Sequence, residues 1–173
     1  MPGPLGATAT YCRRCEPLLL RRTPEDEDEN THRLFSQLVP APTGSGWHWI
    51  GRTNAHGYGL IVPAGGTSRY DWLAHRVMFD LLSPHGGHRL TEQLDHRDGN
   101  RANVAIFNLE PVSKAENLRR RGGPPRGPLE RMWSRRAALL AYSYDLPVPD
   151  GFPSLLDYLA TSGEDTLDTP LAA

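Results

Sequence analysis

The residues best suited to chemistry gather in one stretch, LDHRDGNRANVAIFNLEPVSKAENLRRR, from Leu94 to Arg121. Hydrolysis of a phosphodiester needs a base that activates water and oxygen ligands for a hard cation. His96 suits the first task, because an imidazole with an ordinary pKa of about 6.5 is mostly neutral near pH 7. Asp95 and the side-chain oxygen of Asn117 suit the second, since Mg²⁺ accepts one or two protein oxygens and completes its shell with water and phosphate. The stretch predicts a metal-dependent phosphodiesterase site.

Two strands and a helix are expected to position these residues. EQLDH predicts a strand, residues 97–106 a loop, FNLEPV a second strand, and SKAENLRRR a helix that ends at GGPP. Ser113 and Glu116 form the capping-box pattern, so Ser113 is the N-cap and Asn117 is the fourth helical residue, where an apolar side chain is usual. Asn108 is expected to hold the loop or the histidine through hydrogen bonds to the backbone.

The strand raises a difficulty, because neighbouring side chains on a regular strand point to opposite faces. Asp95 and His96 can serve one phosphate only if the strand ends or twists there, or if the phosphate lies along its edge; RDGN directly afterwards favours a strand end. A plainer interpretation stays open, in which Asp98-Gly99 is an ordinary hairpin turn followed by a capped helix.

The flanking sequence predicts further elements. TPEDEDENTHRLFSQLV indicates a helix over about 24–38, with Thr23 as N-cap and Pro24 in the first turn. WHWIG and GYGLIVP indicate two strands joined by RTNAH as a hairpin. RYDWLAHRVMFDLLS has the apolar spacing of a helix that ends at PHGG, and His75 on it is expected to pack or to make a structural hydrogen bond.

The C-terminal third predicts two more helices, over 128–142 and 153–160. They could pack on the core or bind DNA through Arg131, Arg135 and Arg136, and packing is favoured. The first twenty and the last dozen residues have compositions typical of disorder.

Charge is segregated along the chain, although the net charge is only -1. The window from Arg97 to Arg136 is basic, whereas no Lys or Arg follows Arg136. Local basic residues are what phosphate binding requires, because affinity comes from counterion release at the contact surface. The expected DNA-binding residues are Arg97, Arg101, Lys114, Arg119, Arg120 and Arg121.

The two cysteines, Cys12 and Cys15, form a single CxxC. A structural zinc site needs four ligands, so only half a site is visible, with His32 or His48 as conceivable partners. These cysteines are otherwise expected to be free thiols in a flexible arm.

The ordered motifs LDHRDGN and NLEPVSKAEN, with WHWIGRTNAHGYG and AHRVMFD upstream, resemble the HNH endonuclease family, in particular phage and homing-type members of the ββα-metal superfamily. The resemblance covers Leu34 to Arg121. It implies an α+β fold with a small ββα-metal core, a preceding hairpin and flanking helices. It divides the chain into a flexible arm (1–22), an HNH endonuclease domain (23–121), a helical extension (122–160) and a disordered acidic tail (161–173).

The resemblance also implies roles for individual residues. His96 would be the general base, Asp95 the metal-binding acid, Asn108 the central motif residue that supports the loop and counts with His96 as catalytic, and Asn117 the last motif residue, which binds the metal. The metal would be Mg²⁺, Mn²⁺ or Ni²⁺. Many relatives bind a structural zinc through cysteines, which residues 94–121 lack. Structural zinc is therefore not expected, and packing is expected to hold this unit, through Leu94, Ile106, Phe107, Leu109, Val112 and Leu118.

The implied activity is single-metal hydrolysis of double-stranded DNA that leaves 5′ phosphate and 3′ hydroxyl ends. Phage packaging or replication proteins are candidate partners. No apolar stretch approaches the length of a membrane span, so a cytoplasmic protein is expected, phage-encoded in a bacterial host being one source. Two alternatives stay open: a DNA-binding regulator that keeps the fold without the chemistry, and a nuclease that cleaves RNA or acts as a toxin.

Overall fold

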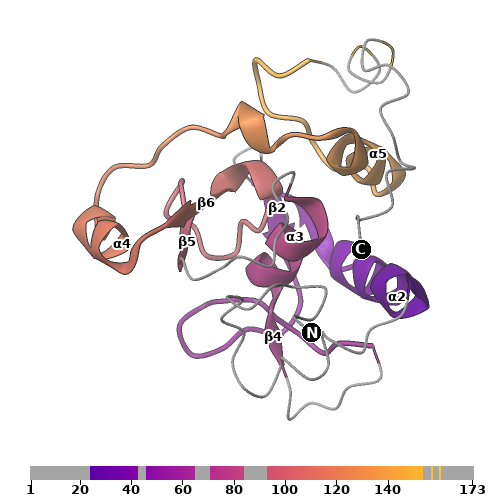
Figure 1. The fold of residues 1–173 in the computed structure, drawn as a ribbon, viewed down its shortest axis with the longest axis horizontal. Helices are drawn as coiled ribbons and strands as arrows, with labels where there is room; N and C mark the ends of the chain where they lie inside the picture. Colours follow the sequence, from indigo (N-terminus) through magenta and orange to yellow (C-terminus); the bar gives the residue numbers. More distant parts are fainter. Residues whose placement is uncertain are drawn as a thin grey trace, which may run out of the picture.

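The computed structural model of this chain describes residues 24–42, 46–64, 71–83 and 93–153, together with Asp157 and Ala160. Within them the fold is α+β, as predicted: helices and 3₁₀ turns surround three separate two-stranded antiparallel sheets (Figure 1). The N-terminal arm with its CxxC, the Thr23 cap, the PHGG segment and the acidic tail all lie outside the described residues.

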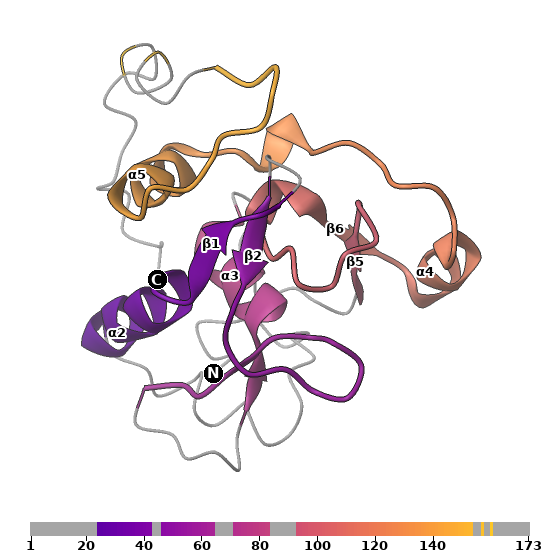
Figure 2. The same ribbon diagram turned by 180° about the vertical axis from the view of Figure 1, so that it is seen from behind.

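The N-terminal helix is shorter than predicted. Helix α2 spans Pro24–Phe35, because Leu38, at the end of the expected helix, belongs to strand β1 (Leu38–Pro40). This strand pairs with β2 (Trp47–Trp49), with Leu38 opposite Trp49, and Figure 2 shows the pair beside α2.

The hairpin predicted from WHWIG and GYGLIVP is wrong in its pairing. Strand β2 pairs with β1, while β3 (Leu60–Ile61) pairs with β4 (Trp72–Leu73). Between the two predicted strands only an isolated bridge forms, from Thr53 to Gly59, closed by the turn at Asn54. The following helix, α3 (Ala74–Leu82), begins later than predicted because Trp72 and Leu73 belong to β4; its apolar face is buried as expected.

The two strands and the helix of the candidate stretch form close to the predicted positions. Strand β5 (Gln93–His96) pairs with β6 (Leu109–Val112), and α4 (Lys114–Arg120) follows directly. The expected second strand is shorter at its start, because Ile106–Asn108 form the 3₁₀ turn η2. Both ribbon views place α4 on one side of the β5–β6 hairpin and α3 on the other (Figures 1 and 2).

The loop between β5 and η2 lies against β2. Trp49 N donates to Ala102 O at 2.8 Å, and Val104 N donates to Trp47 O at 3.0 Å. Gly46 permits this close approach, since a Cβ there would come within 2.5 Å of the Asn103 side-chain nitrogen. The core strand β2 therefore fixes the loop that follows His96.

The C-terminal extension packs on the core, as favoured from the sequence. The helix predicted over 128–142 is broken into the 3₁₀ turn η3 (Glu130–Met132) and α5 (Arg135–Ser143), because Ser134 caps α5 by accepting from Ala137 N. The Trp133 ring lies 6.2 Å from the Trp47 ring and 6.0 Å from that of Phe107. Of residues 153–160 the structure describes Pro153, Asp157 and Ala160, and the last two are helical.

One expected core residue is exposed. Leu94, Ile106, Phe107, Leu109 and Val112 are buried as predicted, but Leu118 is 52% exposed and α4 has no buried residue. Helix α4 is attached through polar contacts to β5 instead, so the apolar packing predicted for Leu118 is wrong. In the described part of the chain, no helix has the length and apolar character needed to cross a membrane.

Candidate active site

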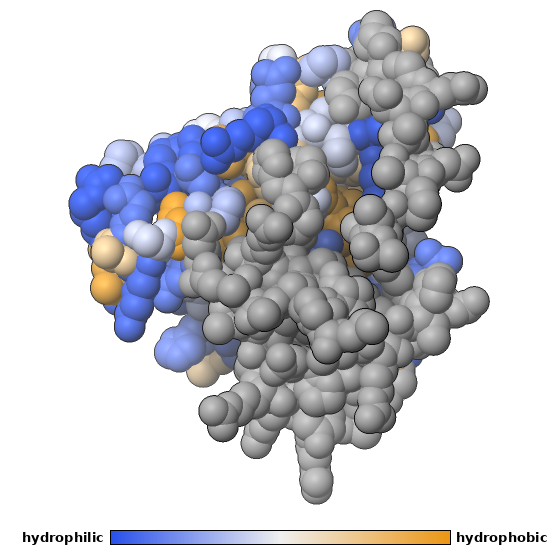
Figure 3. Space-filling model, in the orientation of Figure 1, coloured by the Kyte–Doolittle hydropathy of each residue, from blue (hydrophilic) through white to orange (hydrophobic). Residues whose placement is uncertain are grey.

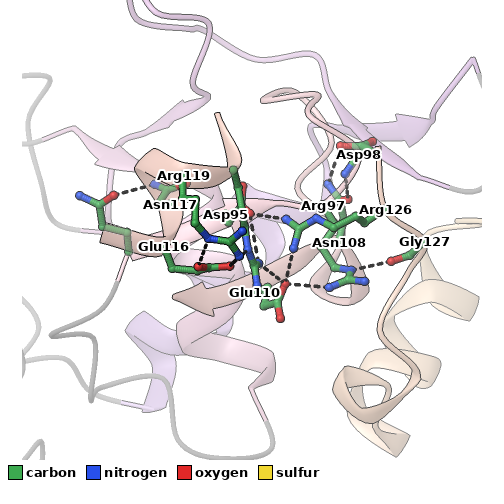
Figure 4. Close-up of polar contacts among 12 residues, drawn as sticks. Asp95, Arg97, Asp98, Asn108, Glu110, Glu116, Asn117, Arg119, Arg126 and Gly127 are labelled. Carbon is green, nitrogen blue, oxygen red and sulfur yellow. Dashed lines mark hydrogen bonds and ion pairs between the residues drawn. The ribbon is translucent and has the colours of Figure 1, made fainter. Parts of the chain in front are cut away.

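Strand β5 presents its side chains to two different surroundings. Leu94 and His96 are buried toward the core, whereas Gln93 and Asp95 are only partly buried on the alternate positions. Asp95 is paired in register with Glu110 of β6, and both carboxylates lie on the side of α4, as Figure 4 shows. Neighbouring side chains of β5 therefore point to opposite faces, as expected of a regular strand.

Helix α4 turns Asn117 toward β5. The helix begins at Ser113, whose Oγ accepts from Glu116 N at 3.1 Å, so the predicted N-cap is confirmed. Asn117 then donates its Nδ2 to Gln93 Oε1 at 2.6 Å. Since the amide nitrogen is engaged and no described residue donates to the amide oxygen, Asn117 Oδ1 is available as an acceptor or ligand.

A pocket of about 310 Å³ joins the two faces of the strand end. Asp95, His96 and Asn117 all line it, so the structure brings together the three residues that sequence analysis assigned to base and cation binding. Strand β5 ends at His96 and turns at Gly99, whose φ of +74° suits glycine. The pocket lies at this strand end, where residues from opposite faces can reach one space.

His96 is held in an aromatic cluster. Its ring lies 4.9 Å from that of His75 on α3 and 5.8 Å from that of Tyr58, measured between centroids, and its Nε2 is buried without a hydrogen-bond partner. Burial lowers the pKa of His96 to about 4, against the opposing effect of the Asp98 and Asp95 carboxylates. His96 is therefore neutral near pH 7, the form that can accept a proton.

His75 is also kept neutral. Burial lowers its pKa well below the ordinary value, and the neighbouring His96 and Arg76 lower it further. The packing role expected for His75 is thus the one observed, with His96 as the ring against which it packs.

Asn108 holds the loop after His96 and does not line the pocket. It is 3% exposed; its Oδ1 accepts from Asp98 N at 3.0 Å, and its Nδ2 donates to Asp98 Oδ1 at 3.0 Å and to Asn103 O at 2.9 Å. Asn103 Nδ2 donates to the other oxygen of Asp98 at 2.8 Å. This loop network, defined as Asp98, Asn103 and Asn108, fixes the turn, and Asn108 holds the loop through hydrogen bonds to the backbone, as expected from the sequence.

Ion pairs cover the Asp95 side of the pocket. Asp95 Oδ2 pairs with Arg126, and Arg120 lies 3.5 Å from the same oxygen. Glu110 Oε2 accepts from Arg97 at 2.7 Å, Arg120 at 2.7 Å and Arg126 at 3.0 Å. Burial acts to raise the pKa of Glu110, but hydrogen bonds from Arg120 and Arg97 outweigh it and hold the pKa below its usual value.

The donor set fits a hard divalent cation. Asp95 offers a carboxylate and Asn117 a free amide oxygen into one polar pocket, and Mg²⁺ or Mn²⁺ prefers such oxygens. No group of three His, Cys, Asp or Glu side chains suited to a metal occurs among the described residues. A cation here would therefore take most of its ligands from water and phosphate.

Four of the six expected DNA-binding residues line the pocket, namely Arg97, Arg101, Arg120 and Arg121. Arg119 is 74% exposed and pairs with Glu116, and Lys114 is exposed at the start of α4. In the space-filling view, hydrophilic side chains cover the region of α4 and the segment after it, on the left of Figure 3.

Sequence reasoning assigned no role to Tyr58, Gln93, Glu110 and Arg126. Tyr58 stands within GYG of a motif used for the family resemblance, and Arg126 lies in the basic window, so weak signals existed. Gln93 and Glu110 carried none, because their importance comes from strand register and not from spacing.

Comparison with known proteins adds no relative: no protein-family model, no curated protein and no solved structure matches this chain.

Proposed function

We propose that this protein is a metal-dependent DNA endonuclease of the HNH type, with a ββα-metal core formed by β5, β6 and α4. The observation that carries the proposal is the shared pocket of His96, Asp95 and Asn117, which contains a neutral base next to two oxygen ligands. The resemblance of LDHRDGN and NLEPVSKAEN to HNH motifs supports it independently of the geometry.

The reaction would be in-line hydrolysis. His96 accepts a proton from water, the water oxygen forms a bond to phosphorus while the bond to the 3′ oxygen breaks, and the 3′ oxygen takes up a proton from solvent. A divalent ion held by Asp95 and Asn117 would stabilise the negative charge on the phosphate and on the leaving oxygen. The products carry a 5′ phosphate and a 3′ hydroxyl.

Other residues of the pocket prepare this step. Tyr58 and His75 pack on the His96 ring, which limits its orientations and shields it from bulk water. Arg101 lies over the Tyr58 ring, 4.9 Å from its centroid, and donates one nitrogen to His56 O; it lines the pocket with Arg121, where both guanidinium groups could contact phosphates.

The test is cleavage of supercoiled plasmid with Mg²⁺, Mn²⁺ or Ni²⁺ and with EDTA, using the wild type, Asp95→Asn and Asn117→Ala. Asp150→Asn, at an exposed site outside the pocket, is the matched control. We expect metal-dependent nicking or linearisation that the pocket variants lose and the control keeps. Duplex binding without cleavage under any metal would favour a DNA-binding regulator, and cleavage of RNA alone would favour the ribonuclease alternative.

A further inference from the structure

Arg126 forms an ion pair with the Asp95 carboxylate, which the proposed cation would need as a ligand. Arg126 pairs with Asp95 Oδ2 through one terminal nitrogen and with Glu110 Oε2 at 3.0 Å through the other. Figure 4 shows its side chain reaching toward both carboxylates. A divalent ion on Asp95 would be repelled by a guanidinium at the same group, because two positive charges in a partly buried site are poorly screened.

The backbone around Arg126 is fixed, so this contact does not depend on a long side chain alone. The strap, defined as residues 121–129, returns from α4 to the core. Arg126 N donates to Arg97 O at 2.6 Å, Arg97 Nε donates to Gly127 O at 2.5 Å, and Leu129 N donates to Phe107 O at 2.7 Å. The strap therefore holds the guanidinium of Arg126 at the pocket, which Arg126 lines.

Positive charge here exceeds what the carboxylates neutralise. Five arginines share ion pairs with three carboxylates in this network: Arg97, Arg119, Arg120, Arg126 and Arg131 with Asp95, Glu110 and Glu116. Glu110 also forms ion pairs with Arg97 and Arg120, which do not involve Arg126. Arg126 can thus leave Asp95 without leaving Glu110 unpaired.

We propose that the Arg126 guanidinium exchanges with a divalent ion at Asp95 and then binds a phosphate of the DNA. It occupies Asp95 while no divalent ion is bound, and it transfers to a phosphate of the DNA when the ion takes Asp95. Binding of the ion and binding of DNA then strengthen each other, because each requires Arg126 to leave the carboxylate. This inference rests on the cation site of the proposed function.

The first measurement is the affinity for Mn²⁺ in the absence of DNA. The concentration of free Mn²⁺ is monitored by electron paramagnetic resonance. Arg126→Gln keeps the backbone bonds of the strap and removes the closer of the two guanidinium groups at Asp95, since Arg120 stays 3.5 Å from the same oxygen, so Mn²⁺ should bind about fivefold or more tightly than to the wild type. Arg131→Gln is the matched control, since Arg131 belongs to the same network but lies 3.8 Å from Glu110 and makes no pair with Asp95. It should change the affinity less than about twofold.

The second measurement is duplex binding by fluorescence anisotropy, with Ca²⁺ and with EDTA, in the His96→Ala background so that the DNA stays intact. Ca²⁺ should strengthen duplex binding, and Arg126→Gln should lose most of that gain. Arg131→Gln should weaken binding similarly under both conditions and keep the gain.

Different results would contradict the cation site and the exchange of Arg126. Mn²⁺ binding that Asp95→Asn does not alter would overturn the cation site and the exchange together. Mn²⁺ binding that depends on Asp95 but is equal in Arg126→Gln and Arg131→Gln would overturn the exchange alone, and so would an unchanged Ca²⁺ gain in Arg126→Gln. Melting curves of each variant verify that it is folded.

Discussion

His75 and His96 contact each other ring to ring, with centroids 4.9 Å apart and planes inclined at 63°, although one lies on α3 and the other at the end of β5. Both rings are buried, and burial lowers the pKa of each. The contact ties the candidate base to the helix that carries much of the apolar core.

This pair should make folding stability depend on pH. Each histidine has a lower pKa in the folded protein than in the unfolded chain, so the unfolded chain binds protons more readily. The stability that the neutral histidines contribute is fully present above about pH 6.5 and is lost as the pH falls toward their pKa values in the folded protein. Between pH 7.5 and 5.5 the free energy of unfolding should drop by roughly 2 to 3 kcal/mol for both residues together. Urea unfolding at the two pH values measures this. His75→Gln should lose about half of the drop, and exposed His56→Gln should keep all of it; equal drops in both variants would contradict the assignment.

Asn108 should contribute to stability well beyond an ordinary asparagine. Asn108→Ala removes an acceptor and two donor contacts from the buried loop network, so the free energy of unfolding should fall by about 2 to 4 kcal/mol. The control is Asn100→Ala, at an exposed position of the same loop, for which about 0.5 to 1 kcal/mol is expected. Similar losses in the two variants would show that the network does not fix the loop.

The polar attachment of α4 can be tested with two leucines. Leu109 is fully buried in β6, so Leu109→Ala should cost about 2 to 5 kcal/mol. Leu118 is half exposed on α4, so Leu118→Ala should change the free energy of unfolding by less than about 0.5 kcal/mol. A large loss for Leu118→Ala in urea unfolding would mean that the helix is held by apolar packing after all.

Gln93 should act as a positioning residue for Asn117. Gln93→Leu removes the acceptor that orients the Asn117 amide, so Mn²⁺ affinity and the cleavage rate should both fall by roughly 10- to 100-fold. Gln37→Leu, whose native side chain bonds Arg33 O outside the pocket, is the control and should keep both. Unchanged Mn²⁺ binding in Gln93→Leu would argue against Asn117 as a ligand.

The local parts of the site follow from the sequence. Ser113 and Glu116 predict the start of α4, and alternation with the Asp98-Gly99 turn predicts β5 and its end, because these signals act within a few residues. The pairing of β2 with β1 was not predicted. The apolar LVP continues the pattern of the preceding helix and predicts more of that helix, whereas Leu38–Pro40 form strand β1 and pair with β2.

Contacts between distant segments could not be predicted. The proximity of Tyr58 and His75 to His96 depends on how α3 and the segment after β2 pack against the β5–β6 hairpin. Arg126 reaches Asp95 only because the strap is hydrogen-bonded back to Arg97 and Phe107. Nothing in residue spacing carries this information.

The proposed nuclease site is tested most directly by single-turnover cleavage of supercoiled plasmid with Mn²⁺. The comparison is between His96→Ala and His32→Ala, an exposed histidine on α2. Loss of the base should slow cleavage by roughly 10²- to 10⁴-fold, with duplex affinity little changed. His32→Ala should cleave like the wild type. Equal cleavage by the two variants would contradict His96 as the base and place the chemistry elsewhere.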